Sequence, residues 1–234
     1  MVIEAPSPNR DARERGRIDM IVLHYTGMPS GAEALARLRD PAAKVSAHFL
    51  LEEDGRLFRL VAEEERAWHA GISYWQGMER LNDVSIGIEI VNPGHAFGYR
   101  PFPAIQMAGL QGLLVELIER YRIRPDRILA HSDIAPDRKE DPGELFDWQG
   151  LARQGIGLWP ESGAGAGIGG EAADLLARIG YRRPHDAASL RTALLAFQRH
   201  WRPARIDGAA DPATLERLAA VADAVDRLAC GQRH

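Results

Sequence analysis

Apolar residues in the first two thirds of the chain alternate between strand-like and helix-like spacing. Residues 17–26 (RIDMIVLHYT) form a nearly continuous apolar run that is too short for most helices, which predicts a buried strand. Residues 46–61 predict a hairpin that turns at Asp54-Gly55. Further strands are predicted at 83–92 and 126–131, and helices at 31–40 and 104–121. This alternation predicts an α/β fold with a central mixed sheet flanked by helices.

The pattern changes near residue 159, where glycine, alanine and serine dominate a stretch that is typical of a flexible linker. Beyond it, three segments with helical spacing predict a small C-terminal three-helix domain, near the lower size limit for independent folding. The helices are predicted at 172–179, 189–200 and 212–228. We therefore divide the chain into a catalytic domain (1–158), a linker (159–170) and a helical domain (171–234), with residues 1–17 as an extended arm.

Composition narrows the function classes. The chain has 234 residues, 26% of them charged, and a net charge of −4, so it lacks the basic balance typical of nucleic-acid binding. Its single cysteine, Cys230, excludes an intramolecular disulfide. The polar N-terminus lacks the apolar core of a secretory signal, and no run approaches the roughly 20 apolar residues of a membrane span. A cytoplasmic location is therefore expected, with the periplasm as the alternative.

Two histidines stand where buried strands are predicted to end. His24 follows MIVL, His131 follows RILA, and Asp141 comes ten residues after His131. Imidazole nitrogen and carboxylate oxygen are ligands that zinc accepts, and three protein ligands leave a fourth position for water, as in catalytic zinc sites. Spacing alone is a weak signal, because a histidine at a strand end is more often an ordinary core or rim residue.

Two further residues suit hydrolytic chemistry. In VSIGIEIV, Glu89 shares a strand face with Ser85 and Gly87, whose small side chains leave room above the sheet. A carboxylate in a half-closed pocket has a raised pKa and suits a general base. Lys139 is close enough to Asp141 in sequence to stabilise an oxyanion at the same site. The ordinary alternatives are a solvent-facing strand glutamate and a surface lysine.

Six segments between about residues 15 and 150 resemble the zinc-dependent N-acetylmuramoyl-L-alanine amidases of the type-2 class, which share a fold with peptidoglycan-recognition proteins. They are IVLHYT, VSAHFLLEEDGRLFRLV, AWHAG, NDVSIGIEIVNPG, ILAHSDIAPDRKEDPG and FDW. The resemblance implies hydrolysis of the amide between N-acetylmuramic acid, or its 1,6-anhydro form, and L-alanine. It implies one Zn²⁺ per chain on His24, His131 and Asp141. Glu89 would handle the proton of the attacking water, and Lys139 would stabilise the tetrahedral intermediate.

The same resemblance suggests four substrate-binding residues: Trp68, His69, His48 and Asn92. A packing role is an equally good interpretation of Trp68 and His48. The remaining acidic residues of the 131–141 loop are expected to shape the loop or to be solvated; they are Asp133, Asp137 and Glu140.

The C-terminal segments LLARIGY and LRTALLAFQRHWRPARIDGAADPATLERLAAV resemble the small helical peptidoglycan-binding module of cell-wall hydrolases. Phe197 and Trp201 are expected in its core. The implied partners are peptidoglycan fragments or anhydro-muropeptides, with no nucleic acid, no membrane span and a monomeric chain. The missing export signal favours soluble anhydro-muropeptides, whereas a wall-binding module favours intact peptidoglycan. A non-catalytic recognition protein is the alternative function, which the complete set of site residues disfavours.

Overall fold

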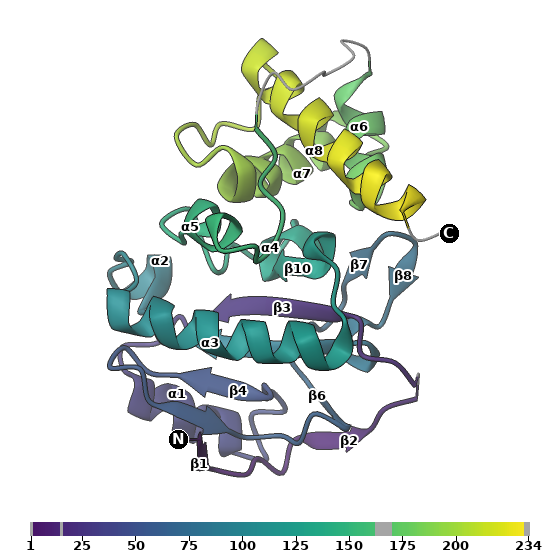
Figure 1. Cartoon of the computed structure of the whole chain (residues 1–234). Coiled ribbons are helices and arrows are strands. Elements are labelled where there is room, and N and C mark those ends of the chain that lie inside the picture. Colours follow the sequence, from purple (N-terminus) through teal and green to yellow (C-terminus); the bar gives the residue numbers. More distant parts are fainter. Residues whose placement is uncertain (1, 15, 162–169, 232–234) are drawn as a thin grey trace.

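A six-stranded mixed sheet forms the centre of the molecule in this computed structural model, which describes residues 2–14, 16–161 and 170–231 (Figure 1). The order across the sheet is β1 (Val2–Glu4), β5 (Leu57–Arg59), β4 (Phe49–Leu51), β9 (Ser85–Ile90), β3 (Met20–Tyr25) and β10 (Ile128–Ala130). Strands β4, β9, β3 and β10 are parallel, and β5 is antiparallel to β4. The carboxyl ends of four strands therefore meet at one edge, where open α/β sheets bind ligands.

The strand predictions for this sheet are confirmed, but the N-terminal arm is more structured than expected. Within it, β1 pairs in parallel with β5, and β2 (Arg10–Ala12) pairs antiparallel with β6 (Glu65–Ala67). A second small ribbon joins β7 (Tyr74–Trp75) to β8 (Met78–Glu79). Short exposed strands lack an apolar period, so hydrophobic spacing did not reveal them.

Helix α3 (Ala104–Tyr121) covers one face of the sheet (Figure 1). Alternate strand residues such as Ile21, Leu23 and Ile88 pack there against leucines of α3. On the opposite face, α1 (Gly31–Arg39) packs through Leu38 against a cluster that includes Leu50. The remaining short helices are η1 (Leu81–Asp83), α2 (Gly94–Phe97), η2 (Pro125–Arg127), α4 (His131–Ile134) and α5 (Trp148–Arg153). The sheet residues between those facing α3 therefore point to the opposite face of the sheet.

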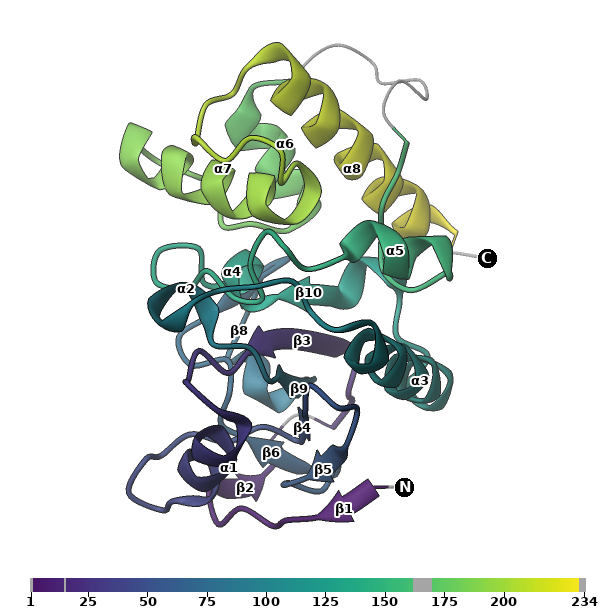
Figure 2. The ribbon, with the colours of Figure 1, turned by 90° about the vertical axis from the view of Figure 1, so that its left-hand side faces the viewer.

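The three C-terminal helices lie beyond β10 and beside α4 and α5 (Figures 1 and 2). They are α6 (Ala172–Ile179), α7 (Ala187–Trp201) and α8 (Pro212–Cys230), as the periodicity predicted. Phe197 and Trp201 are buried in one apolar cluster that also contains Met20 and Val22 of the sheet. The helical part therefore packs directly on the first part of the chain. Most of the predicted linker, residues 162–169, lies outside the described residues.

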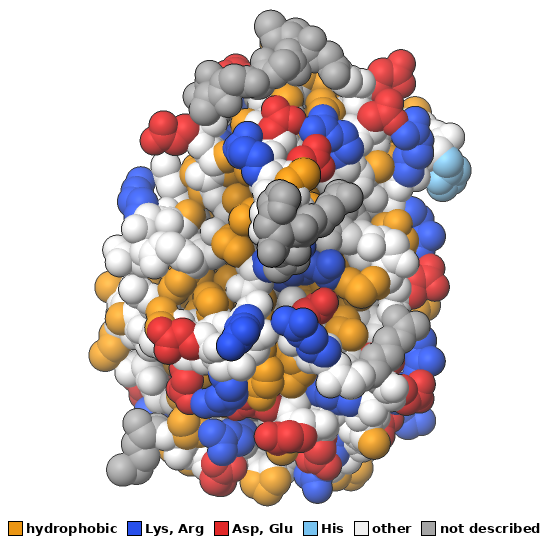
Figure 3. Space-filling model, turned by 45° about the vertical axis from the view of Figure 1, so that its right-hand side comes forward, with side chains coloured by type: hydrophobic (Ala, Val, Ile, Leu, Met, Phe, Trp, Pro, Cys, Tyr) orange, Lys and Arg blue, Asp and Glu red, His pale blue; other side chains and the backbone are white. Residues whose placement is uncertain are grey.

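Acidic and basic side chains are interspersed on the face shown in Figure 3, and neither sign dominates it. None of the helices among the described residues is long and apolar enough to cross a membrane.

Candidate metal centre and active site

The alternation of strand residues places three chemical groups at one sheet edge. In β3, Ile21 and Leu23 face α3, so His24 points to the opposite side. His24 is paired in register with Glu89 of β9. Ala130 of β10 pairs with Leu23, so His131, the next residue, follows at the same edge.

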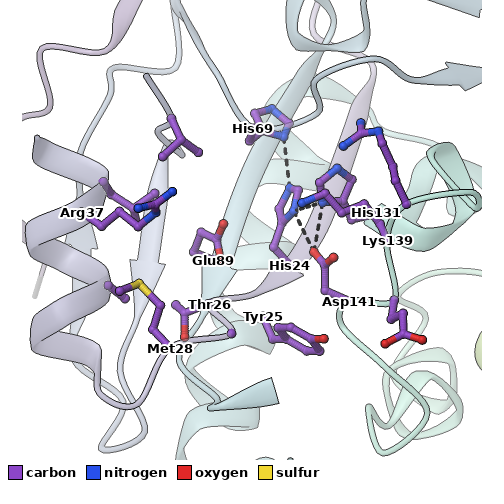
Figure 4. A pocket seen from close by; sticks show the side chains of 16 residues that line it. His24, Tyr25, Thr26, Met28, Arg37, His69, Glu89, His131, Lys139 and Asp141 are labelled. Carbon is purple, nitrogen blue, oxygen red and sulfur yellow. Dashed lines mark hydrogen bonds and ion pairs between the residues drawn. The ribbon is translucent and has the colours of Figure 1, made fainter. Parts of the chain in front are cut away.

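Three donor atoms converge at this edge (Figure 4). Nδ1 of His24 lies 2.9 Å from Nδ1 of His131, and each nitrogen lies 3.1 Å from Oδ2 of Asp141. All three side chains are buried. The backbone carbonyl of Asp141 accepts a hydrogen bond from the Ser132 amide at 3.0 Å, which brings the end of the loop back to its start.

The three donors suit a metal ion. Donors about 2.0–2.2 Å from a tetrahedral ion lie roughly 3.3 Å apart, close to the three separations seen here. Two nitrogens and one carboxylate oxygen also match the donor types of catalytic zinc sites. His24, His131 and Asp141 could therefore hold a metal ion between them, as the sequence pattern suggested.

The tautomer of His24 follows from a chain of hydrogen bonds behind it. The Ser85 hydroxyl donates to the Leu81 carbonyl at 2.6 Å, so its oxygen accepts from Nε2–H of His69 at 3.1 Å. Nδ1 of His69 is then unprotonated and accepts from Nε2–H of His24 at 3.1 Å. The lone pair of His24 Nδ1 is consequently left for a metal, the usual arrangement behind a histidine ligand.

His131 is oriented on its far side by the backbone. Its Nε2 lies 3.4 Å from the Ala70 carbonyl, and Arg138 donates to the same oxygen at 2.7 Å. The loop after β6 and the 131–141 loop are therefore tied together next to the donor cluster.

Burial and neighbouring charges set the ionisation of the donors. Burial lowers the pKa of His24 to about 4, with the neighbouring His131 charge adding to the effect, so the imidazole stays neutral at pH 7. Burial alone would raise the pKa of the Asp141 carboxyl. The interactions of this carboxyl with the neighbouring His131 and His24 outweigh burial and lower that pKa far below its usual range. A neutral histidine and an ionised carboxylate are the metal-binding forms.

Glu89 lies next to this cluster without sharing its hydrogen bonds. Its Oε2 is buried and has no hydrogen-bond partner in the described part of the chain. Burial raises the pKa of the Glu89 carboxyl well above its usual range, the Asp141 charge adds to this, and the charge of Lys139 opposes it. A carboxylate with a raised pKa and a free oxygen can accept and return a proton.

The cluster forms the floor of a cavity of about 410 Å³. Lys139 and Glu140 come from the 131–141 loop, and Ala34, Arg37 and Leu38 come from α1 on the other side. Figure 4 shows Arg37 projecting from α1 toward Glu89, opposite the three donors. The cavity therefore has a cation on each wall and a carboxylate between them.

Of the four predicted substrate-binding residues, the structure brings only His69 to the cavity wall, where it also supports His24. Trp68 donates from its indole nitrogen to Asp11 at 3.2 Å, outside the cavity lining. His48 is 0% exposed, and its Nδ1 accepts the Gly87 amide at 3.0 Å. Asn92, also 0% exposed, donates to the Arg100 carbonyl at 2.7 Å. His48 and Asn92 thus lie outside the cavity lining, with polar groups that bond to buried backbone.

Sequence reasoning missed two arginines at the cavity. Arg37 lies on the exposed side of an amphipathic helix, where an arginine is ordinarily solvated, so its position gave no signal. Arg138 precedes Lys139, and nothing in the sequence distinguishes it from the other charged residues of the loop. Of the two expectations for Asp133, solvation is wrong because the residue is 1% exposed, whereas its carboxylate does shape the loop by accepting the Ala130 amide, and it also contacts the helical part.

Comparison with known proteins identifies the family. A model of the N-acetylmuramoyl-L-alanine amidase family (Amidase_2) matches residues 14–144. The N-acetylmuramoyl-L-alanine amidase AmiD of Escherichia coli K12 is 41% identical over 223 residues, covering 85% of this chain and 80% of the relative. The 1,6-anhydro-N-acetylmuramyl-L-alanine amidase AmpD of Haemophilus influenzae is 36% identical over 162 residues, covering 61% of this chain and 86% of AmpD.

Solved structures extend the likeness to the helical part. A complex of Escherichia coli AmiD with anhydro-N-acetylmuramic acid-L-Ala-D-γ-Glu-L-Lys superposes with a TM-score of 0.78 at 39% identity, covering 94% of this chain and 93% of that one. AmpDh3 of Pseudomonas aeruginosa, in complex with an anhydromuramic pentapeptide, has a TM-score of 0.78 at 33% identity, with 91% and 93% coverage. With its fold, its donor cluster and these similarities, the chain belongs to the N-acetylmuramoyl-L-alanine amidase family.

Proposed function

We propose that this chain is a zinc-dependent amidase that cleaves the bond between N-acetylmuramic acid, or its 1,6-anhydro form, and the L-alanine of a stem peptide. The observation that carries this proposal is the position of Glu89. Its free, buried carboxylate oxygen lies beside three converging donors on the floor of an open cavity. A non-catalytic recognition protein has no need of such a carboxylate.

Zn²⁺ is the ion that this donor set suits, with His24, His131 and Asp141 as its three protein ligands. Bound there, zinc would polarise the substrate carbonyl and make water more acidic. The hydrogen-bonded chain behind His24 keeps the lone pair of Nδ1 directed at the ion.

Two side chains of the cavity, Glu89 and Lys139, carry out the proton transfer and the charge stabilisation. Glu89 takes a proton from the attacking water, because its carboxylate has a raised pKa and no competing partner among the described residues. The same carboxyl then returns the proton to the leaving amine. Lys139 lines the cavity beside the donors, and its ammonium stabilises the negative charge that develops on the carbonyl oxygen.

Arg37 supplies a site for the stem peptide. The ligand of the Escherichia coli AmiD complex contains a γ-linked D-glutamate, and a γ-linkage leaves the α-carboxylate of that residue free. Arg37 points into the cavity, and its guanidinium has no hydrogen bond or ion pair within the described residues, so it is available for a carboxylate. The proposed substrate therefore places its acidic residue toward α1.

The experiment offers the zinc-loaded full chain two substrates, anhydro-N-acetylmuramic acid-L-Ala-D-γ-Glu-L-Lys and intact sacculi, and follows the release of peptide with a free L-alanine amine. We expect cleavage of both, with a higher kcat/KM for the soluble compound because the cavity is enclosed on two sides. Binding of either without release of peptide would instead support the recognition protein. The cytoplasmic location and the monomeric state stay predictions, which cell fractionation and sedimentation test.

A further inference from the structure

The loop that carries His131, Lys139 and Asp141 is contacted at both ends by the C-terminal helices. Figure 2 shows α7 beside α4, and the two helices are in contact. We propose that the helical part is a positioning element for the metal centre, acting through Tyr181, Arg199 and His200. This inference rests on the proposed function, because it presumes that the donor cluster binds zinc.

The buried end of the loop is held at Asp133. Its Oδ2 accepts the Ala130 amide at 2.8 Å and Nδ1–H of His200 at 2.7 Å, and its Oδ1 accepts the Tyr181 hydroxyl at 2.6 Å. Ala130 and Asp133 flank His131 in sequence. The carboxylate therefore sets the turn in which His131 leaves β10, and two of its three partners belong to the helical part.

His200 has little freedom to leave this position. It is 3% exposed, and its ring is stacked between Trp148 at 3.8 Å and Trp201 at 3.6 Å between ring centroids. A buried carboxylate whose hydrogen bonds are all satisfied is held rigidly. Loss of one partner leaves a buried charge without a hydrogen bond, which destabilises the folded state. Asp133 thus links His200 of α7 to the backbone of Ala130, the residue that precedes the metal donor His131.

The outer end of the loop is held by the preceding residue of α7. Arg199 donates to Glu140 at 3.0 Å, and Glu140 lies between Lys139 and Asp141 in sequence. The Arg199 side chain is only 12% exposed, whereas that of Glu140 is 52% exposed, so solvent screens this ion pair from one side and its effect should be smaller than that of the buried contacts at Asp133. Two adjacent residues of one helix, Arg199 and His200, therefore contact both ends of the loop.

Packing favours this role over that of a loosely attached wall-binding module. Leu176, Phe197 and Leu218 of the helical part share one buried cluster with Met20 and Leu129 of the central sheet. A module that acts only as a tether needs no such common core.

The test measures Zn²⁺ affinity by competition with a chelating dye, together with kcat and KM on the soluble tripeptide substrate. The full-chain variants are Tyr181→Phe and His200→Phe, which remove a donor and retain most of the packing, and Arg199→Ala, which removes the guanidinium together with its apolar stem. We expect the zinc dissociation constant to rise about tenfold in the first two, the lower range for residues that orient metal ligands. Arg199→Ala should raise it a few-fold and lower kcat more than it changes KM, and Arg199→Lys should restore most of both.

The matched control is Arg178→Ala, which removes ion pairs to Asp223 and Asp226 within the helical part and does not reach the loop. It should lower the Tm and leave zinc affinity within twofold of wild type. If the Phe variants fail to fold, Arg199→Ala, with its lysine rescue, decides the question. Wild-type zinc affinity and kcat in the folded variants, despite a lowered Tm, would overturn the inference. A wild-type chain that binds no zinc would instead overturn the proposed function.

Discussion

The imidazole of His69 occupies the space where a side chain of residue 87 would begin. A Cβ added to Gly87 would lie 2.4 Å from Cγ of His69, far inside van der Waals contact. The glycine therefore allows His69 to lie over β9, where it links Ser85 to His24. This contact explains in physical terms why a small residue is needed in the middle of a buried strand.

Gly87→Ala should consequently damage the metal centre without touching a ligand. The added methyl displaces the His69 ring and breaks its hydrogen bond to His24, so we expect zinc affinity to fall about tenfold and kcat to fall with it. Gly112→Ala, in α3 with nothing within 4 Å of the added Cβ, is the control and should stabilise the helix slightly. Unchanged zinc affinity in Gly87→Ala would show that His69 does not orient His24.

Asp141→Ala should abolish stoichiometric zinc binding, because it removes one of three donors and leaves two histidines facing each other. Asp137→Ala is the matched control, since Asp137 is an exposed carboxylate in the same loop outside the donor cluster. Elemental analysis after gel filtration measures both. Full zinc occupancy in Asp141→Ala would exclude this carboxylate from the site.

Much of the centre could be predicted from the sequence because it obeys local rules. His24, Glu89 and His131 follow from strand alternation and from the convergence of parallel strand ends. The surroundings of other residues could not be predicted from local rules. His48 and Asn92 lie in segments adjacent to the site, but whether their side chains face the cavity or a buried backbone group depends on tertiary packing. The buried contacts of Asp133 could not be predicted for the same reason, since its partners lie 48 and 67 residues away.

Arg37→Ala should weaken substrate binding more than chemistry. One charge-assisted hydrogen bond to the substrate is lost, so we expect KM to rise roughly tenfold with kcat within about twofold. Arg39→Ala, on the same helix but outside the cavity lining, should change neither constant. The same kinetic constants are then measured on a substrate whose D-glutamate α-carboxylate is replaced by an amide. If the amide substrate is affected by Arg37→Ala as strongly as the acid, the guanidinium does not bind that carboxylate.

The stability of the metal-free protein should fall as the pH is lowered through the acidic range. Burial, with the Arg13 charge, lowers the pKa of His48 from 6.5 to about 3. Below pH 6.5 the His48 imidazole is protonated in the unfolded chain but stays neutral in the folded chain. The free energy of unfolding therefore decreases between about pH 6.5 and pH 3. The contribution is up to about 1.4 kcal/mol per pH unit for one proton.

Urea unfolding of wild type and His48→Asn at several pH values measures this contribution. Asparagine retains an acceptor for the Gly87 amide but does not titrate. The variant should be less stable near neutral pH. Its free energy of unfolding should also depend less steeply on pH, by the equivalent of about one proton. Parallel slopes for the two proteins would show that His48 is not the group responsible.

The role of Glu89 is tested most directly by the turnover of zinc-loaded Glu89→Gln on anhydro-N-acetylmuramic acid-L-Ala-D-γ-Glu-L-Lys, with Glu119→Gln on the exposed side of α3 as the control. Glutamine keeps the size of the side chain and removes its ability to take a proton. We expect one zinc per chain in both variants, control kcat equal to wild type, and kcat of Glu89→Gln lowered by about 10²–10⁴-fold. A zinc-loaded Glu89→Gln with wild-type kcat would contradict the assignment of Glu89 as the proton-transferring group.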